Sequence, residues 1–235
     1  MKYDTTRPSR SAGSASRAKL LFSMRTVLLC LLAAAVCLTA GCRRAPDMRE
    51  ASTALLDAVY KGSPSEYSRL TGIPTADLSS RQTQWLSSRT DQFLSAFGGL
   101  DPSQETRDKI SKFLSMAYAG ADYSIQSSQE SASVTIRPIT LLTDALPEIQ
   151  SYTESFNKKN AEFEYYELTS REYADTYLEG LLTLLTSKLS DLHYGDPVQV
   201  PLPFEKGDDG LYAFSTESLG DITQAVLPFP AAAQK

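Results

Sequence analysis

The 235-residue sequence predicts an α+β protein with a helical N-terminal part, followed by two β-hairpins that form a small antiparallel sheet packed on a long helix. Apolar residues recur at helical spacing up to about residue 117, alternate with polar residues in two later segments, and return to helical spacing between about 144 and 192. No internal repeat and no Gly/Ser-rich linker interrupts residues 47–228, so we expect a single domain there.

Four helices are expected before the first strand. The first two should cover about 47–61 and 63–71, because each opens with a capping box, in which Asp or Ser is followed three residues later by Glu, and each closes at a glycine. The third helix is expected over about 75–97, before a Gly-Gly pair. The fourth should start at Asp101, where Asp-Pro is followed by Gln at the third position.

Two segments alternate apolar and polar residues, which is typical of half-buried strands in hairpins. The first covers about 123–137 around a polar turn at 127–130, and the second covers about 198–214 around a Gly-Asp-Asp-Gly turn. Pro201 and Pro203 fall on the outward-facing positions of the second segment, and proline has no amide donor. We therefore expect this segment to lie at the edge of a sheet.

A long helical stretch is expected over about 144–192, broken near Asn160 or at Thr169, and a short helix over about 217–226 closes the domain. The second half of the long stretch carries a broad apolar stripe, which we interpret as a core face covered by the two hairpins. The stripe consists of Tyr173, Tyr177, Leu181, Leu184, Leu185, Leu189 and Leu192. Residues 229–235, rich in Pro and Ala, are expected to be a disordered tail.

An uninterrupted apolar stretch, Val27–Leu38, follows a basic flank near the N-terminus. Twelve helical residues span only about 18 Å, against a hydrocarbon core of roughly 30 Å, so the stretch is typical of the h-region of a signal peptide. We predict that residues 1–41 form a signal peptide that is removed, and that residues 42–46 form a short tether. The sequence is compatible with a start at Met1 or at Met24.

Small residues precede a cysteine directly after the apolar stretch, in Ala40-Gly41-Cys42. These residues resemble the lipobox of bacterial lipoprotein precursors, although Thr39 stands where that family usually has an aliphatic residue. The resemblance implies that Cys42 receives a diacylglyceryl group, becomes the new N-terminus, and anchors the exported protein to the outer face of the cell membrane. The alternative is a cytosolic protein whose first helix ends in Gly-Cys.

The order of helices, hairpin, long helix, hairpin and helix resembles that of small lipoproteins of Gram-positive bacteria whose function is unassigned. More distantly, it is similar to cystatin-like and nuclear-transport-factor-2-like folds, in which a curved sheet wraps a long helix. This resemblance covers about residues 45–228 and carries no functional motif, so it implies no site residues.

Composition excludes several classes of function. Residues 42–235 carry 17 basic and 27 acidic side chains, a net charge of −10, so we expect no nucleic-acid partner. Cys30 and Cys37 lie in the segment predicted to be removed, which leaves Cys42 alone and allows no disulfide within the mature chain. With one histidine and no glycine-rich phosphate loop, we expect neither a metal site nor a nucleotide cofactor.

The single imidazole, His193, is flanked by Asp191 and Asp196 and could act as a general base oriented by a carboxylate. We favour a structural interpretation, in which His193 interacts with the dipole at the end of the long helix, before the turn Gly195-Asp196-Pro197. Ser155 and Lys158 match the Ser-x-x-Lys pattern of penicillin-recognising enzymes, but the companion motifs of that family are absent. We expect this pair to lie on a solvated helix face.

Two acidic groups are candidate ligand or cation sites. Asp208-Asp209 lacks the spacing of an EF-hand loop, so we interpret it as a turn. The second group interleaves acidic and aromatic residues, and a charged helix face with buried aromatics explains it more simply than a ligand site does. It consists of Glu162, Phe163, Glu164, Tyr165, Tyr166, Glu167 and Glu172.

No motif identifies a nucleophile, a cofactor or a metal centre, so we assign no catalytic residue. The favoured hypothesis is a non-enzymatic, lipid-anchored domain that binds a small ligand or a protein at the cell envelope. The alternatives are a pocketed hydrolase or isomerase that uses His193, and a structural subunit of an envelope complex. A cavity containing His193 or a buried carboxylate would favour the enzyme, whereas an open aromatic groove would favour the binding domain.

Overall fold

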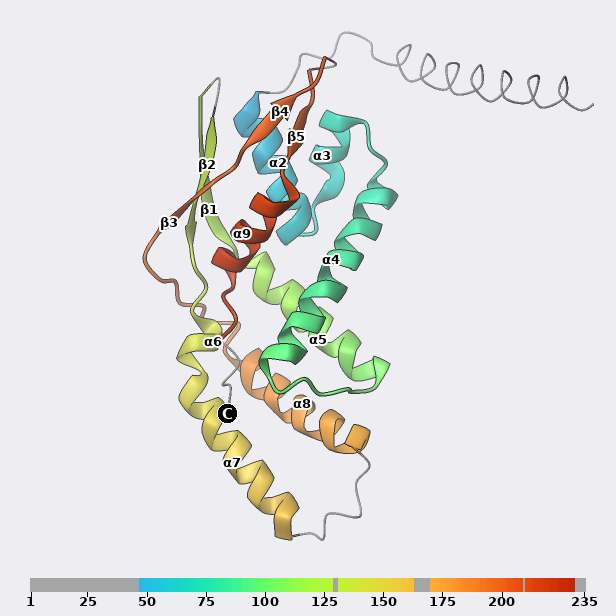
Figure 1. Cartoon of the computed structure of the whole chain (residues 1–235), viewed down its shortest axis with the longest axis vertical. Coiled ribbons are helices and arrows are strands. Elements are labelled where there is room, and N and C mark those ends of the chain that lie inside the picture. Colours follow the sequence, from blue (N-terminus) through green and yellow to red (C-terminus); the bar gives the residue numbers. More distant parts are fainter. Residues whose placement is uncertain (1–46, 129–130, 163–169, 209, 231–235) are drawn as a thin grey trace, which may run out of the picture. The chain divides into compact units, whose positions relative to one another are not determined.

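Local capping chemistry builds the helices at the start of the fold, which are α2 (Met48–Tyr60), α3 (Pro64–Thr71), α4 (Thr75–Ala96) and α5 (Gln104–Ala119). The computed structural model describes residues 47–128, 131–162, 170–208 and 210–230 (Figure 1). The α+β class is confirmed, because these helices are followed by short antiparallel strands and further helices.

The helix ends follow the sequence expectations with two corrections. The Asp47 carboxylate accepts a hydrogen bond from the Glu50 amide at 2.7 Å, as expected of an N-cap. The Ser63 side chain makes no capping hydrogen bond, so α3 relies on Pro64 in its first turn and on left-handed Gly72 at its end. Helix α5 begins after Ser103, and not at Asp101, because the Ser103 hydroxyl accepts from the Thr106 amide.

The described residues contain five strands, which form two separate antiparallel sheets. The first sheet has the order β1-β2-β3, with β1 at Asp122–Ser127, β2 at Ala132–Arg137 and β3 at Val198–Pro201. The second pairs β4 (Phe204–Lys206) with β5 (Tyr212–Phe214). The first hairpin and the edge position of β3 are therefore confirmed.

The segment expected as one strand, from residue 198 to 204, divides between the two sheets. The Leu202 amide donates to the Ala132 carbonyl at 2.9 Å, which completes the pairing with the first sheet. Pro203 follows and has no N–H to continue the ladder. The chain then leaves β2, and β4 pairs with β5 instead, so the expected single sheet is corrected to two.

The helical stretch expected over about 144–192 consists of α7 (Leu146–Glu162) and α8 (Ser170–Ser187), and the short helix α6 (Leu141–Asp144) precedes it. Of the two positions expected for a break, Asn160 lies inside α7 and Thr169 lies outside the described residues. Helix α8 ends before the predicted residue 192, because the chain continues in tighter turns from Lys188 onward. Helix α9 (Thr216–Val226) closes the fold.

The leucine stripe of α8 forms core, as predicted, but its partners differ from those expected. Leu178, Leu181 and Leu185 are fully buried, and α8 packs mainly against α5 and α7, at the end of the domain remote from β4 and β5 (Figure 1). Helices α2 and α9 pack against the three-stranded sheet. The three-stranded sheet therefore covers α2 and α9. The apolar stripe of α8 is covered by α5 and α7, and not by the two hairpins as expected.

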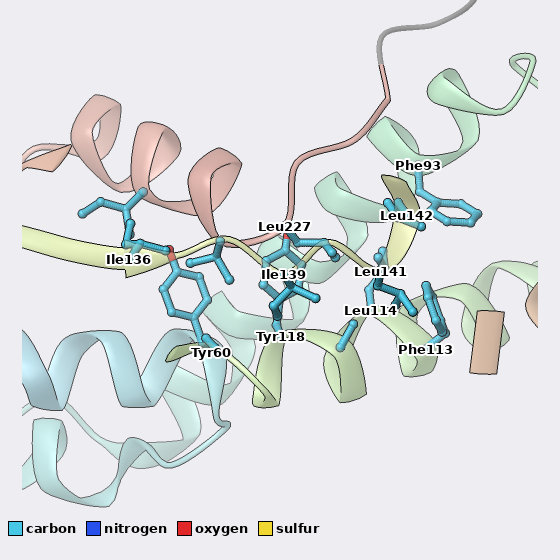
Figure 2. Close-up of a cluster of buried hydrophobic side chains, with 14 of the residues drawn as sticks. Tyr60, Phe93, Phe113, Leu114, Tyr118, Ile136, Ile139, Leu141, Leu142 and Leu227 are labelled. Carbon is cyan, nitrogen blue, oxygen red and sulfur yellow. The ribbon is translucent and has the colours of Figure 1, made fainter. Parts of the chain in front are cut away.

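The core runs between the sheet and the helices. Figure 2 shows Tyr60, Tyr118 and Ile136 meeting at one part of this core and Phe93, Phe113 and Leu142 at another. The chain beyond α9 also contributes, because the ring of Phe229 lies 6.1 Å from that of Phe93.

A side chain of α8 caps α5. The Asp175 carboxylate accepts hydrogen bonds from the Ser103 amide at 2.8 Å and from the Ser103 hydroxyl at 3.0 Å. Burial raises the pKa of Asp175, but the hydrogen bonds from Ser103 and Thr106 and the charge of Arg171 outweigh this effect and hold the pKa below its usual range. The charged carboxylate therefore stabilises the fold.

We expect Asp175→Asn to destabilise the protein most near neutral pH. Because the folded-state pKa is depressed, the stabilisation is present above the unfolded pKa of about 4 and is lost as the pH falls through the folded value. Urea unfolding of both proteins across a pH series measures this difference, which should shrink in acid. A difference that is constant with pH would show that the charge of Asp175 plays no part.

Candidate functional site

The described residues enclose a groove of about 790 Å³ between α2, α3, α4, β5 and α9. This volume lies within the range of about 300–1,000 Å³ that is usual for ligand sites. The walls come from segments far apart in the sequence, and α4 supplies one long side while β5 and α9 supply the other. The groove is therefore a product of tertiary packing.

Most of the groove surface is apolar and aromatic. Helices α2 and α4, together with β5 and α9, contribute the side chains of Leu55, Val59, Leu78, Trp85, Phe214 and Leu219. Polar side chains are interspersed along the walls, among them Gln82, Ser88, Gln92, Thr216 and Gln224. Apolar contact supplies most of the binding energy at such sites, and a few polar groups orient the ligand.

Trp85, the only tryptophan of the chain, belongs to an aromatic cluster beside the groove. Its ring centroid lies 4.8 Å from that of Tyr118 and 5.7 Å from that of Tyr60, in edge-to-face arrangements. Tyr60 in turn stacks on Tyr118. Rings packed in this way are held in fixed orientations, so Trp85 presents a preformed surface.

Tyr60 also ties two walls together. Its hydroxyl shares a hydrogen bond with the Thr223 hydroxyl at 3.0 Å, which connects α2 to α9. Burial raises the pKa of Tyr60 to about 12, although the hydrogen bond to Thr223 opposes this rise. The hydroxyl is therefore uncharged at physiological pH, and the connection between the walls is maintained.

The most unusual residue of the groove is Arg89, which is only 4% exposed. Its guanidinium lies 4.3 Å from the Phe229 ring centroid, and its Nη2 donates to the Leu227 carbonyl at 3.4 Å. Its Nη1 donates to Gln92, and the guanidinium also lies 5.6 Å from the Tyr118 ring centroid, whereas its Nε has no hydrogen-bond partner among the described residues. A buried cation normally pairs with a carboxylate, and none of the ion pairs among the described residues includes Arg89.

A second arginine, Arg81, lies on the same side of the groove and is exposed. Burial raises the pKa of Tyr67, a residue of α3 that lines the same groove, and the positive charge of Arg81 partly offsets this rise. Arg81 forms no ion pair with a described carboxylate. The groove lining contains no Asp, Glu or His, so its two formal charges are both positive.

The histidine singled out by the sequence lies elsewhere. The side chain of His193 is 68% exposed, with its Nδ1 at 3.5 Å from Asp144 and its Nε2 at 3.7 Å from Asp191. It follows the end of α8 by six residues, so its predicted position in the last helical turn is wrong. His193 instead lies in an extended connection, where its carbonyl accepts from the Thr140 amide.

The other sequence candidates do not form a site in the described structure. Ser155 and Lys158 are both exposed on α7, and no hydrogen bond joins them. Asp208 is exposed, and Asp209 lies outside the described residues, as do most of the acidic and aromatic residues between 162 and 167. Within the described ranges, no three His, Cys, Asp or Glu side chains lie together in a way that could hold a metal ion.

No sequence motif marks the groove, although α4 carries one indication of it. Gln82 and Arg89 occupy the same helix face as Leu78, Trp85 and Phe93, where apolar residues are expected. An arginine on an apolar face is rarely buried unless a partner or a ligand compensates for its charge. This irregularity could have marked α4 as functional, but the opposite walls could not have been assigned.

Fold and site together define a mixed α+β domain with an aromatic, positively charged groove. No family model matches the chain, and none of the curated proteins matches it. The fold is similar to the crystal structure of a Bacillus subtilis protein, ycdA, described as a lipoprotein, with a TM-score of 0.56 and 15% sequence identity. The alignment covers 78% of this chain and 56% of that chain.

At this level of identity the similarity shows a shared fold, and the chain spans little more than half the length of its neighbour. The similarities to cystatin-like and nuclear-transport-factor-2-like folds remain predictions. Cys42 and the predicted signal peptide lie outside the described residues. In the part of the chain that is described, no helix combines the length and the apolar character needed to cross a membrane.

Proposed function

We propose that the protein is a lipid-anchored lipoprotein of the cell envelope whose folded domain binds a ligand or a partner, without catalysis, in the groove beside α4. One observation carries the binding role: the groove is lined by aromatic side chains and two arginines, and it contains neither His193 nor a carboxylate. A hydrolase or isomerase of the kind considered above needs a general acid or base in its pocket.

The envelope location rests on the N-terminal sequence. The apolar stretch, the small residues before Cys42 and the short tether agree with an exported and lipidated protein. The fold shared with a protein described as a lipoprotein supports the same proposal. The protein would therefore present its groove at the outer face of the cell membrane.

Cys42→Ser is expected to release the protein from the membrane fraction, because two acyl chains provide durable anchoring and this substitution removes their attachment point. Fractionation of cells and incorporation of labelled palmitate measure the effect. Cys37→Ser is the matched control, since Cys37 lies in the segment predicted to be removed, and it should leave both measurements unchanged. Membrane-bound Cys42→Ser protein, together with unlabelled wild type, would contradict the lipoprotein assignment.

The binding role is tested by filling the groove. Gly220 faces the groove from α9, and a Cβ placed there meets no atom within 4 Å, so Gly220→Phe should occupy the groove without disturbing the fold. Ser155→Phe on the exposed face of α7 is the matched control. We expect a ligand or protein recovered from native membranes to bind wild type and the control, but not Gly220→Phe. Equal recovery by all three proteins would refute the assignment of the groove.

A further inference from the structure

Strand β5 has one edge that no other strand covers within the described parts of the chain. It pairs only with β4, and the hairpin between them closes with a glycine bulge. In this turn the Gly207 amide donates to the Leu211 carbonyl at 2.9 Å, the Gly210 amide donates to the Gly207 carbonyl at 2.9 Å, and Gly210 has a φ of 78°. These bonds fix which residues of β5 face β4.

Hydrogen-bonded and non-hydrogen-bonded pairs alternate along an antiparallel ladder. Because residues 207 and 211 are bonded, the next bonded pair is Glu205 with Ala213. The amide and carbonyl groups of Tyr212 and Phe214 therefore point away from β4. Among the described residues, no backbone hydrogen bond connects Tyr212 or Phe214 to another element on that side.

This free edge borders the groove. Tyr212, Ala213 and Phe214 all line it, although side chains alternate between the two faces of a strand. Tyr212 and Phe214 are half-buried and Ala213 is exposed, so the groove reaches two side chains of one face and the backbone between them. Unpaired amide and carbonyl groups at such an edge are a template for a further strand.

The opposite wall supplies side chains that suit a peptide chain. Gln92 and Ser88 from α4 can donate to and accept from backbone amides, as can Gln224 from α9 on the same side as β5, while Trp85 of α4 offers an apolar surface. A fatty acid would use the apolar surface but would leave the edge of β5 and these amides unmatched. The groove therefore fits an extended peptide better than an acyl chain.

Charge adds a second requirement. Of the described residues that line the groove, only Arg81 and Arg89 are charged, in a chain whose net charge is −5. The guanidinium of Arg89 is buried with an unpartnered Nε, so an anion in the groove would offset a charge that the described residues leave without a counter-ion. The complementary ligand carries a carboxylate.

We infer that the groove binds an extended peptide, which adds as a strand to the free edge of β5 and places a carboxylate toward Arg81 and Arg89. This inference rests on the proposed function and specifies its ligand. The carboxylate can be the C-terminus of the peptide or an Asp or Glu side chain, since both present the same chemistry to a guanidinium.

The probe is a library of random hexapeptides with free carboxyl ends, selected on the full-length protein in detergent against Gly220→Phe as the blocked control. Binding of selected peptides is followed by the fluorescence of Trp85, the only tryptophan. Selected peptides should carry apolar residues at alternate positions. N-methylation of alternate amides, which removes donors to β5, should weaken binding about tenfold or more.

The charge is tested on both partners. Arg81→Glu should weaken binding about tenfold or more, whereas Arg49→Glu, an equal charge change at an exposed site outside the groove, should not. Amidation of the C-terminus and replacement of Asp or Glu by Asn or Gln identify which carboxylate is used. If neither amidation nor replacement of the acidic side chains weakens binding, the charge requirement is wrong.

The outcomes separate this inference from the proposed function. If dodecanoate displaces the peptides and N-methylation has no effect, the groove is a lipid site and strand addition is wrong. If no peptide is enriched over Gly220→Phe while a membrane component still binds in a Gly220-dependent manner, the groove binds but the peptide inference fails. If nothing binds in a Gly220-dependent manner, both proposals fail.

Discussion

Leu185→Ala is expected to lower the free energy of unfolding by about 2–5 kcal/mol, because truncation of a buried leucine loses apolar burial and leaves a cavity. Leu185 is fully buried on the face of α8 that packs against the rest of the core. The sequence predicted this role from the helical spacing of the stripe. The packing of α8 against α5 and α7 explains why little relaxation is available to fill the space.

His193→Ala is the control for this prediction, since a surface substitution usually changes stability by less than about 0.5 kcal/mol. The exposed His193 side chain lies near Asp144 and Asp191 but outside the groove. Urea unfolding of both variants measures the contrast, and groove binding by His193→Ala should equal that of wild type. A folded His193→Ala protein without function would restore the enzyme hypothesis that uses this imidazole.

Local sequence determined the helices because caps and apolar spacing act within a few residues. Asp47 and the left-handed Gly72 mark helix ends, and α9 begins beside Ser215, close to the position that the sequence predicted. One of the errors has a distant cause. Ser103, and not Asp101, caps α5, and the amide of Ser103 donates to Asp175, 72 residues away.

Strand pairing could not be predicted in the same way. The segment around Leu202 reads as one alternating strand. Its later part, β4, pairs with nearby β5 as the expected hairpin requires, but its earlier part, β3, pairs with β2, which is distant in sequence. Pro203 indicated an edge, and it marks the point where the chain changes sheets. Alternation predicts that a strand exists, whereas the choice of partner depends on which neighbours the helices bring together.

The residues of the candidate site were harder to predict than the strands, because sequence motifs consist of reactive residues at short spacing. His193, Ser155 and Lys158 satisfied such patterns and are exposed outside the groove. Arg89 satisfied none of them, yet it is the buried, unpaired cation of the groove. The missing feature is a carboxylate that could pair with Arg89. Its absence from the described groove lining can be recognised only once the packing of α4, β5 and α9 is known.

Two glycines in helices provide the last test of the structure, because they predict effects of opposite sign for the same substitution. At Gly180 in α8, a Cβ would overlap the Tyr152 hydroxyl and lie 2.6 Å from the ring carbon that bears it. That hydroxyl donates to the Tyr177 carbonyl at 2.9 Å, so it cannot move without losing this bond. At Gly220 in α9, a Cβ meets nothing within 4 Å.

Gly180→Ala should therefore destabilise the protein by about 1–3 kcal/mol, the usual cost of overpacking, even though alanine favours a helix. Gly220→Ala should stabilise it by about 0.5–1 kcal/mol, because alanine restricts the unfolded chain and fits the helix. Denaturant unfolding of both variants measures these changes. Tyr152→Phe removes the overlapping oxygen, so Gly180→Ala should cost less in that background. If Gly180→Ala lowers the free energy of unfolding equally in both backgrounds, the contact between Tyr152 of α7 and residue 180 of α8 is not the reason that glycine is required there.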